Sequence, residues 1–322
     1  MFKKVVVTGA AGFIGSTLID SLLSQGIEVL GIDNFSTGKI EFLKEALVNP
    51  QFTLLKEDLY LGKSLSSVFV GMDAVFHLAA NADVRFGPDH PGRDLEQNTI
   101  ATHKVLEAAR IAGVKNFMFS STGSVYGEAE VAPTPEDAPF PIQTSLYGAS
   151  KLACEGLISA YAESFGMQVW IFRFVSILGP RYTHGHVFDF YQQLIQNPDT
   201  LTVLGNGHQK KSYLHVSDCI EAIHISLREL SNAVNIINLG VDGYCEVRDS
   251  IGWITNEMGL DPQINFGTES KGWIGDNPLI HLDTQKILSL GWSPQYSIEE
   301  AVRDTVGYMD ANRWMFTGNA KK

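Results

Sequence analysis

The sequence is poor in cysteine and in positive charge, and it has no long apolar run. Its three cysteines, Cys154, Cys219 and Cys245, are odd in number and far apart, which fits neither a disulfide framework nor the ligand spacing of a zinc site. We therefore expect reduced thiols, no metal and a cytoplasmic location. No stretch of about 18 uninterrupted apolar residues exists, and the run at residues 5–7 is too short for a signal peptide, so we expect no membrane partner.

The charge balance argues against nucleic acid as a partner. Lys and Arg number 24 against 36 Asp and Glu, which gives a formal net charge of −12 over 322 residues. A protein this acidic repels phosphate backbones, although a local cluster of donors can still hold a small anion. Apolar residues make up 44% of the chain, as is typical of a globular protein that needs no disulfide or metal to fold.

Short apolar runs alternate with segments of helical period in the first half of the chain. Strands are expected over residues 4–8, 28–33, 52–57, 74–78 and 116–121, and helices over 12–25 and 98–112. The strands are continuously apolar and helices follow them, which predicts an α/β fold with a Rossmann-type, doubly wound parallel sheet. The second half is less regular. We expect a first domain over residues 1–175, to which residues 212–240 return, and a smaller interleaved α/β domain over 176–322.

A glycine-rich segment joins the first strand to the first helix. In TGAAGFIG, Gly9 permits a tight turn, Gly12 lets the backbone approach a pyrophosphate, and Gly15 allows the helix to pack closely on the strand. The strand–turn–helix context makes a dinucleotide site the better interpretation of these glycines. Asp33 ends the second strand, 24 residues after Gly9, where a carboxylate accepts hydrogen bonds from ribose hydroxyls and repels a 2′-phosphate. This favours NAD over NADP.

Tyr147 and Lys151 form a candidate catalytic pair. They are four residues apart and share a helix face, although such a pair alone is more often a solvated surface. Here the pair follows Ser120 and Thr122 at the end of an expected strand, downstream of the dinucleotide segment. A free Tyr has a pKa of about 10, and a nearby ammonium and a positive nicotinamide favour its phenolate. Tyr147 can then act as a base on a carbinol that Thr122 positions.

Together these segments resemble the extended short-chain dehydrogenase/reductase family, and within it the NAD-dependent sugar-nucleotide epimerases of the UDP-glucose 4-epimerase type. The resemblance covers nearly the whole chain. It rests on TGAAGFIG from Thr8, DNFSTGK from Asp33, HLAANADVR from His77, SSTGSVYGE from Ser120, YGASK from Tyr147, FRFVSILGPR from Phe172, LGNGHQKKSYLHVSD from Leu204 and KGWIGD from Lys271.

The resemblance implies a reaction and a set of site residues. Tyr147 would deprotonate the C4 hydroxyl with Thr122 as helper while hydride leaves C4, and the 4-keto sugar would then turn and take hydride back on its other face. Implied cofactor contacts are Gly9, Gly12, Phe13, Ile14, Gly15, Asp33, Asn34, Ser36, Thr37, Gly38, Asp58, Leu59, Leu78, Ala79, Ala80, Asn98, Ser120, Tyr147, Lys151 and Val175. Implied substrate contacts are Arg85, Thr122, Ser124, Tyr147, Ser176, Val187, Lys211 and Lys271.

Departures from the family pattern bear on substrate and reaction. Lys211 and Lys271 stand where the family usually has arginines that clamp a diphosphate, and lysine lacks the bidentate fork. Arg85, Arg181 and Lys210 are alternative donors. Related dehydratases carry an Asp-Glu pair directly after the Thr, and decarboxylases usually a Glu at the second position, where this chain has Gly123 and Ser124.

The missing carboxylates favour a 4-epimerase of a UDP-hexose, most simply UDP-glucose to UDP-galactose in galactose metabolism. Other UDP-sugars (an N-acetylhexosamine, a uronic acid, a pentose) stay open. A lyase is the second hypothesis. A non-catalytic NAD-sensing module is the third, but such proteins typically lose the Tyr/Lys pair. Helices 98–112 and 147–165 carry small and apolar residues beyond what one face needs. The resemblance implies that this pair forms a four-helix dimer interface, so we expect a homodimer; the alternative is that the two helices cover the sheet of a monomer. We expect His77 and His215 to be packed or hydrogen-bonded, and His184 and His186 to lie in a loop near the nucleotide.

Overall fold

The computed structural model describes residues 2–82, 87, 89–140, 142–269 and 279–316. Its centre is a parallel seven-stranded sheet in the order β11-β6-β5-β4-β1-β2-β3. The strands are β1 (Lys4–Thr8), β2 (Glu28–Asp33), β3 (Phe52–Lys56), β4 (Ala74–His77), β5 (Asn116–Thr122), β6 (Gln168–Phe174) and β11 (Val234–Leu239). The order reverses between β1 and β4, which is where ligands bind in doubly wound sheets. The predicted fold class is confirmed.

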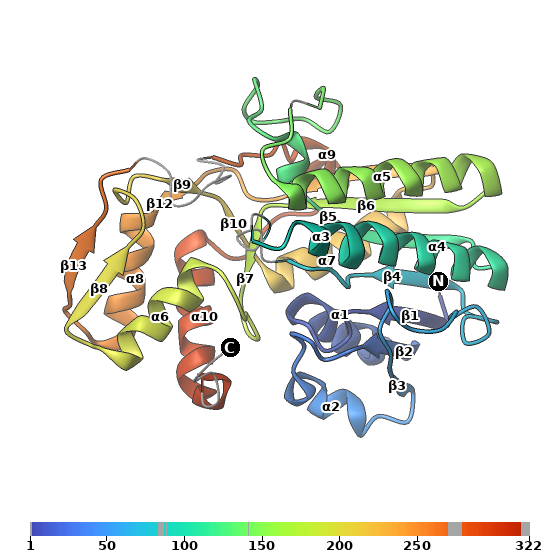
Figure 1. Cartoon of the computed structure of the whole chain (residues 1–322), viewed down its shortest axis with the longest axis horizontal. Coiled ribbons are helices and arrows are strands. Elements are labelled where there is room, and N and C mark those ends of the chain that lie inside the picture. Colours follow the sequence, from blue (N-terminus) through green and yellow to red (C-terminus); the bar gives the residue numbers. More distant parts are fainter. Residues whose placement is uncertain (1, 83–86, 88, 141, 270–278, 317–322) are drawn as a thin grey trace.

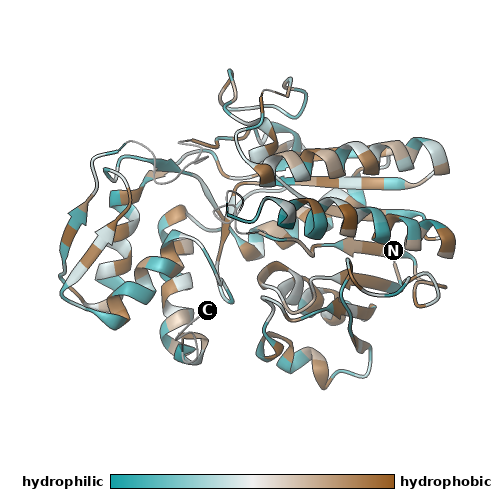
Figure 2. Cartoon of the chain, viewed as in Figure 1, coloured by the Kyte–Doolittle hydropathy of each residue, from teal (hydrophilic) through white to brown (hydrophobic). Residues whose placement is uncertain are grey.

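Helices cover both faces of this sheet (Figure 1). α4 (Ala101–Ala112) and α5 (Leu146–Phe165) lie on one face, and α1 (Phe13–Ser24) and α7 (Val216–Glu229) on the other. Within β1, Val6 packs in the core beneath α4 and α5, whereas Val5 and Val7 pack in the core on the opposite face. Burial on both sides explains the continuous apolar run of β1, and Figure 2 shows brown ribbon along the centre of the sheet.

The later segments build three small two-stranded sheets, β7 with β10, β9 with β12, and β8 with β13. Their strands are β7 (Ser176–Leu178), β8 (Thr200–Val203), β9 (Lys210–Lys211), β10 (Tyr213–His215), β12 (Cys245–Glu246) and β13 (Gln263–Phe266). The associated helices are α6 (His186–Gln196), α8 (Val247–Met258), α9 (Gln285–Ser289) and α10 (Ile298–Ala311). In Figure 1, α6, α8 and α10 gather with β8 and β13 beside the large sheet. The division at residue 175 stays a prediction.

Shorter elements complete the chain and change one expected boundary. They are α2 (Lys44–Leu47), α3 (Pro91–Asp94), the 3₁₀ turns Ile40–Leu43, Gly123–Tyr126 and Arg313–Phe316, and a π-helical turn at Leu95–Ile100. The helix expected from Asn98 therefore begins seven residues earlier, at Pro91, and its first part is wound more loosely. No helix within the described residues is long and apolar enough to cross a bilayer.

Capping residues fix where two helices begin. The Ser145 hydroxyl accepts the Gly148 N–H at 3.0 Å and caps α5, which begins at Leu146, one residue before Tyr147. Ser297 and Glu300 form a capping box at the start of α10.

Candidate active site

The glycine-rich turn after β1 has the geometry of a phosphate cradle. Gly9 has a φ of +70°, and a Cβ there would lie 2.8 Å from the backbone nitrogen of Ala79. A Cβ on Gly15 would lie 2.0 Å from the Gly9 carbonyl oxygen, so both positions require glycine. Gly12 provides no side-chain cap to α1, and the first turn of α1 carries no acidic residue. The partial positive charge of this helix terminus therefore faces no internal anion and suits a diphosphate.

Asp33 is oriented by the backbone around it. Its carboxylate accepts the N–H of Ala11 at 2.9 Å and the N–H of Phe35 at 2.7 Å. Burial raises the pKa of Asp33, and these two hydrogen bonds act in the opposite direction. At the next strand end, Asp58 accepts a hydrogen bond from the Asn34 amide at 2.7 Å. The Asn34–Asp58 hydrogen bond thus joins the segments that follow β2 and β3 at the carboxyl end of the sheet.

His77 is a structural histidine at the end of β4. Its Nδ1 lies 2.7 Å from the Thr8 hydroxyl and its Nε2 3.0 Å from the Thr102 hydroxyl. The ring is fully buried, and burial lowers the pKa of His77 to about 3. The Thr8 hydroxyl also accepts the N–H groups of Leu78 and Ala79. The expectation of a packed, hydrogen-bonded histidine is confirmed, and the contact fixes the ends of β1 and β4 together.

The three predicted catalytic residues meet at the end of β5. Tyr147, in the first turn of α5, makes a side-chain hydrogen bond with Thr122. Burial raises the pKa of the Tyr147 phenol, and the Thr122 hydrogen bond works against that rise. Lys151 is 2% exposed and its Nζ donates to the Ser120 carbonyl at 2.8 Å. Burial lowers the pKa of Lys151 to about 8. A phenol, an ammonium and a hydroxyl therefore share one strand end, as a proton-transfer site requires.

Asn98 joins this group to the loop after β4. It lies in the π-helical turn, where its Oδ1 accepts the Asn81 N–H at 2.8 Å and its Nδ2 donates to the Ser150 hydroxyl at 2.9 Å. Ser150 stands between Tyr147 and Lys151 on α5. Sequence reasoning missed Asn81 and Ser150. The only signal in the sequence was that Ser150, a small residue, stands directly before Lys151.

A cavity of about 740 Å³ opens at Tyr147 and reaches Lys211 on β9. This volume lies within the range of typical small-molecule sites, about 300–1,000 Å³. The structure brings eight predicted residues to its wall, namely Phe13, Ile14, Thr122, Ser124, Tyr147, Val175, Ser176 and Lys211. Sequence reasoning missed Thr144, Tyr182, Gln193, Gln209 and Tyr213, which also line it.

The other predicted residues are placed as follows. The loops after β2, β3 and β4 lie at the carboxyl end of the sheet, as Asp33 does. They carry Asn34, Ser36, Thr37, Gly38, Asp58, Leu59, Leu78, Ala79 and Ala80. The Val187 side chain is fully buried in the core and is not part of the cavity wall. Arg85 and Lys271 lie outside the described residues.

Lys211 is the only Lys or Arg of the described segments that lines the cavity. Arg181 instead pairs with Asp20 on α1 at 2.6 Å, and Lys210 donates to the Tyr244 hydroxyl at 3.0 Å. Neither alternative donor is therefore part of the cavity wall.

His184 and His186 both line the cavity, but His186 is the first residue of α6 rather than a loop residue. It contacts the Tyr213 hydroxyl, and its Nε2 lies 2.9 Å from the Ser250 hydroxyl. Burial lowers the pKa of His186 to about 3, so it is a neutral hydrogen-bonding group. Across the part of the chain that the structure describes, no group of three His, Cys, Asp or Glu side chains is arranged to hold a metal ion.

Comparison with known proteins gives a consistent set of relatives. The model of the NAD dependent epimerase/dehydratase family matches residues 5–240. A Bacillus subtilis protein named uncharacterized UDP-glucose epimerase YtcB is 32% identical over 317 residues, covering 96% of this chain and 98% of that protein. UDP-glucose 4-epimerase of Mycolicibacterium smegmatis is 30% identical, with coverage of 95% and 98%. UDP-glucuronic acid decarboxylase 1 of Xenopus tropicalis is also 30% identical, with coverage of 95% and 72%.

Solved structures agree with these relatives. A crystal structure of UDP-galactose 4-epimerase is 37% identical with a TM-score of 0.86, covering 97% of this chain and 100% of that one. UDP-glucuronic acid 4-epimerase from Bacillus cereus, in complex with UDP-glucuronic acid and NAD, is 30% identical with a TM-score of 0.86 and coverage of 96% and 99%.

Proposed function

The chain belongs to the NAD dependent epimerase/dehydratase family, and we propose that it is a 4-epimerase of a UDP-hexose, interconverting UDP-glucose and UDP-galactose. The observation that carries this proposal is the contact of Tyr147 with Thr122 at one end of the cavity, with Lys151 beside it and no acidic residue at positions 123 and 124.

The cofactor is NAD, and the residues present fit it. The uncapped start of α1 suits its diphosphate, and Asp33, already oriented by two backbone N–H groups, suits its adenosine ribose. When bound, NAD supplies the acceptor and donor of a hydride at C4 of the sugar. Lys151 would hold the nicotinamide ribose, as the resemblance implies, since an ammonium has three donors and its Nζ uses one of them on the Ser120 carbonyl.

Tyr147 moves the proton in the proposed reaction. Its oxygen takes the proton of the C4 hydroxyl, which the Thr122 hydroxyl holds in place. The Lys151 ammonium, one helical turn away, favours the phenolate that this step needs. Tyr147 returns the proton after the 4-keto sugar has turned its other face toward it, and the cavity of about 740 Å³ supports such a rotation.

The proposed substrate contacts divide along the cavity. Thr122, Ser124 and Tyr147 line the sugar end, and Ser176 lies between this end and Lys211. Lys211 would balance the diphosphate as a point charge. Arg85, Val187 and Lys271 remain proposed contacts on resemblance alone.

A lyase would need acid–base side chains at positions 123 and 124. The site has no room for one at position 123 and carries a serine at position 124. A Cβ on Gly123 would lie 2.5 Å from the Ile280 side chain and 3.3 Å from the Leu282 side chain. Ser124 reaches the cavity with a hydroxyl, which accepts from Thr122 at 3.2 Å and has no proton to give near neutral pH. These residues support C4 oxidation and reduction without elimination or decarboxylation.

We also propose a cytoplasmic homodimer that serves galactose metabolism. Exposed apolar side chains on α4 and α5, Ile111, Leu146 and Phe165, support a partner on this face. Sedimentation of the purified protein tests the dimer. A monomer at micromolar concentration contradicts it.

One incubation series tests the proposed activity. The purified protein is mixed, without added cofactor, with UDP-glucose, UDP-galactose, UDP-N-acetylglucosamine, UDP-glucuronic acid and UDP-xylose, and the C4 configuration of each product is read by NMR. We expect UDP-glucose and UDP-galactose to interconvert with no mass change. A product that has lost water or CO₂ would show that the protein is a lyase. Selective turnover of another UDP-sugar would show that it is an epimerase of that sugar. No turnover of any sugar contradicts the proposal.

A further inference from the structure

Arg173 on β6 and Glu155 on α5 form a buried ion pair that the proposed reaction does not use. Their side chains are 1% and 4% exposed, respectively. The Arg173 guanidinium donates two hydrogen bonds to the Glu155 carboxylate, from Nη2 to Oε2 at 2.7 Å and from Nε to Oε1 at 3.1 Å. Apolar residues of similar volume are often as stabilising as a buried ion pair, because burial strips both charges of water. The pair therefore calls for an explanation beyond stability.

Glu155 connects the catalytic helix to the catalytic strand. On α5 it lies one turn after Lys151 and two turns after Tyr147, so the three side chains share a face. The Ser121 hydroxyl donates to the same Glu155 carboxylate. Ser121 directly precedes Thr122 at the end of β5. Through these contacts Glu155 links the helix that carries Tyr147 to the strand that ends at Thr122.

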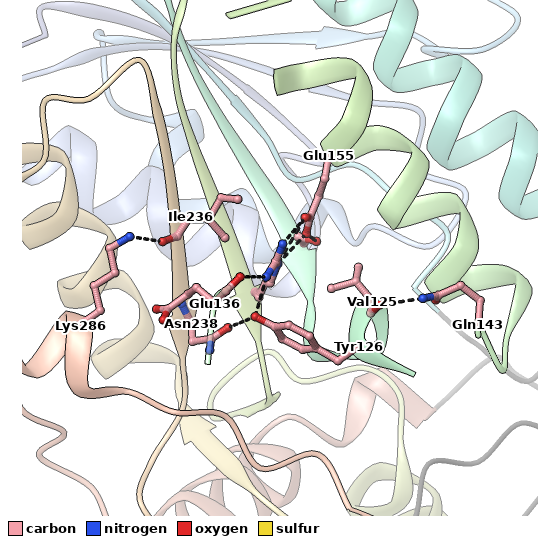
Figure 3. A network of polar contacts seen from close by, with 10 residues as sticks. Val125, Tyr126, Glu136, Gln143, Glu155, Ile236, Asn238 and Lys286 are labelled. Carbon is pink, nitrogen blue, oxygen red and sulfur yellow. Dashed lines mark hydrogen bonds and ion pairs between the residues drawn. The ribbon is translucent and has the colours of Figure 1, made fainter. Parts of the chain in front are cut away.

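A second branch leaves the other side of the guanidinium (Figure 3). Arg173 Nη1 donates to the Tyr126 hydroxyl, and this hydroxyl donates to the Asn238 Oδ1 at 2.9 Å. The Asn238 amide nitrogen donates to the Asp283 carbonyl at 3.1 Å. Three residues before Asp283, Ile280 lines the sugar end of the cavity. This branch holds the wall that faces the sugar.

One buried cation thus ties together four segments that deliver groups to the reaction centre, α5, β5, β6 and the segment around Asp283. We propose that Arg173 and Glu155 are positioning residues that hold Tyr147 at hydrogen-bonding distance from Thr122. This inference rests on the proposed function, in which that distance controls proton transfer.

The sharpest single change is Ser121→Ala, because it cuts the link from Glu155 to β5 without leaving an unpaired buried charge. Its control is Ser226→Ala in α7, another buried serine, whose hydroxyl donates to the Ala222 carbonyl of its own helix. We expect Ser121→Ala to lower kcat about tenfold or more, with KM and bound NAD unchanged, since small misplacements of reacting groups are costly. Equal kcat in the two variants overturns the proposal.

The double variant Glu155→Leu/Arg173→Met removes both charges together and so avoids an orphaned ion. Its control is Glu299→Leu/Arg303→Met, which removes an exposed pair on α10 and with it the contact of Arg303 to Glu257 on α8. We expect a folded Glu155→Leu/Arg173→Met protein with kcat lowered by about 10²-fold. A folded double variant with wild-type kcat overturns the proposal, and if this variant does not fold, the serine comparison decides.

A spectroscopic titration separates positioning from stability and does not depend on the substrate. The ionisation of Tyr147 is obtained as the difference in phenolate absorbance between each protein and its Tyr147→Phe derivative. Burial raises the pKa of Tyr147 and the Thr122 hydrogen bond offsets part of that rise, so loosening their contact should raise the titration midpoint further in Ser121→Ala but not in Ser226→Ala. An unmoved midpoint overturns the proposal. Failure of the wild-type protein on every nucleotide sugar contradicts the proposed function and leaves this comparison intact.

Discussion

Ile280 occupies the space that any side chain at position 123 would need. Its Cγ2 lies 2.5 Å from the point where a Cβ on Gly123 would stand, closer than real carbon atoms approach. We expect Gly123→Ala to lower the free energy of unfolding by about 1–3 kcal/mol through overpacking. Combining it with Ile280→Ala should recover part of this loss. Urea denaturation of the two single variants and the double variant measures the coupling, and additive effects would contradict the contact.

Replacing Tyr147 by Phe should abolish turnover while the cofactor stays bound. Loss of a general base typically costs about 10²–10⁴-fold in rate. The measurement is kcat for epimerisation, together with the NAD released on denaturation. Tyr191→Phe is the control, because that hydroxyl bonds to Asp310 on α10 and is not part of the proposed chemistry. Full activity in Tyr147→Phe would remove Tyr147 from its proposed role.

Replacing Asp33 by Asn should weaken NAD binding about tenfold or more and reduce the discrimination against NADP. The amide keeps one acceptor but places an NH₂ group against the N–H of Ala11 or Phe35. Calorimetric Kd values for both dinucleotides measure the change. Asp73→Asn is a matched control, since Asp73 also accepts two backbone N–H groups, those of Lys3 and Lys4 at the other end of β1. The same losses in both variants would point to general instability.

Replacing Lys211 by Met should raise the KM for the nucleotide sugar about tenfold or more, with a smaller effect on kcat. A charged hydrogen-bond partner is worth about 1.5–3 kcal/mol, and this one acts on the diphosphate away from the reacting carbon. Its neighbour Lys210 donates to Tyr244 and is not part of the cavity wall, so Lys210→Met should leave KM unchanged. Equal effects of the two substitutions would reject a specific role for Lys211.

Acid should destabilise the protein through His77. Its folded-state pKa is about 3 against an ordinary value of 6.5, so between these pH values the unfolded chain binds a proton that the folded chain excludes. The free energy of unfolding therefore falls as pH drops from 6.5 toward 3, by up to about 1.4 kcal/mol per pH unit. His77→Gln removes this titration. Denaturation curves from pH 7 to 4 should be steeper in pH for the wild type, and parallel slopes would contradict the prediction.

The sequence predicted the site best at positions where the backbone conformation or the chemistry allows few residue types. Gly9 and Asp33 could be assigned because a left-handed turn and a carboxylate at the next strand end leave few alternatives. Arg181 is the contrary case. Its sequence neighbourhood suggested a diphosphate donor, but the side chain pairs with Asp20, which is distant in sequence. The Arg173–Glu155 pair was also missed, because only the packing of α5 against β6 shows that these two side chains meet.

The order of strands also bears on synthesis of the chain. Val169 of β6 pairs with Val234 of β11. The sheet therefore lacks its last strand on that side until α7 and all of β11 have left the ribosome. Until then β6 presents an apolar edge whose backbone groups lack their partners, a template for association with other chains. The same late strand brings Asn238 to Tyr126. A nascent chain would therefore acquire its protected edge and the Tyr126–Asn238 contact in a single event.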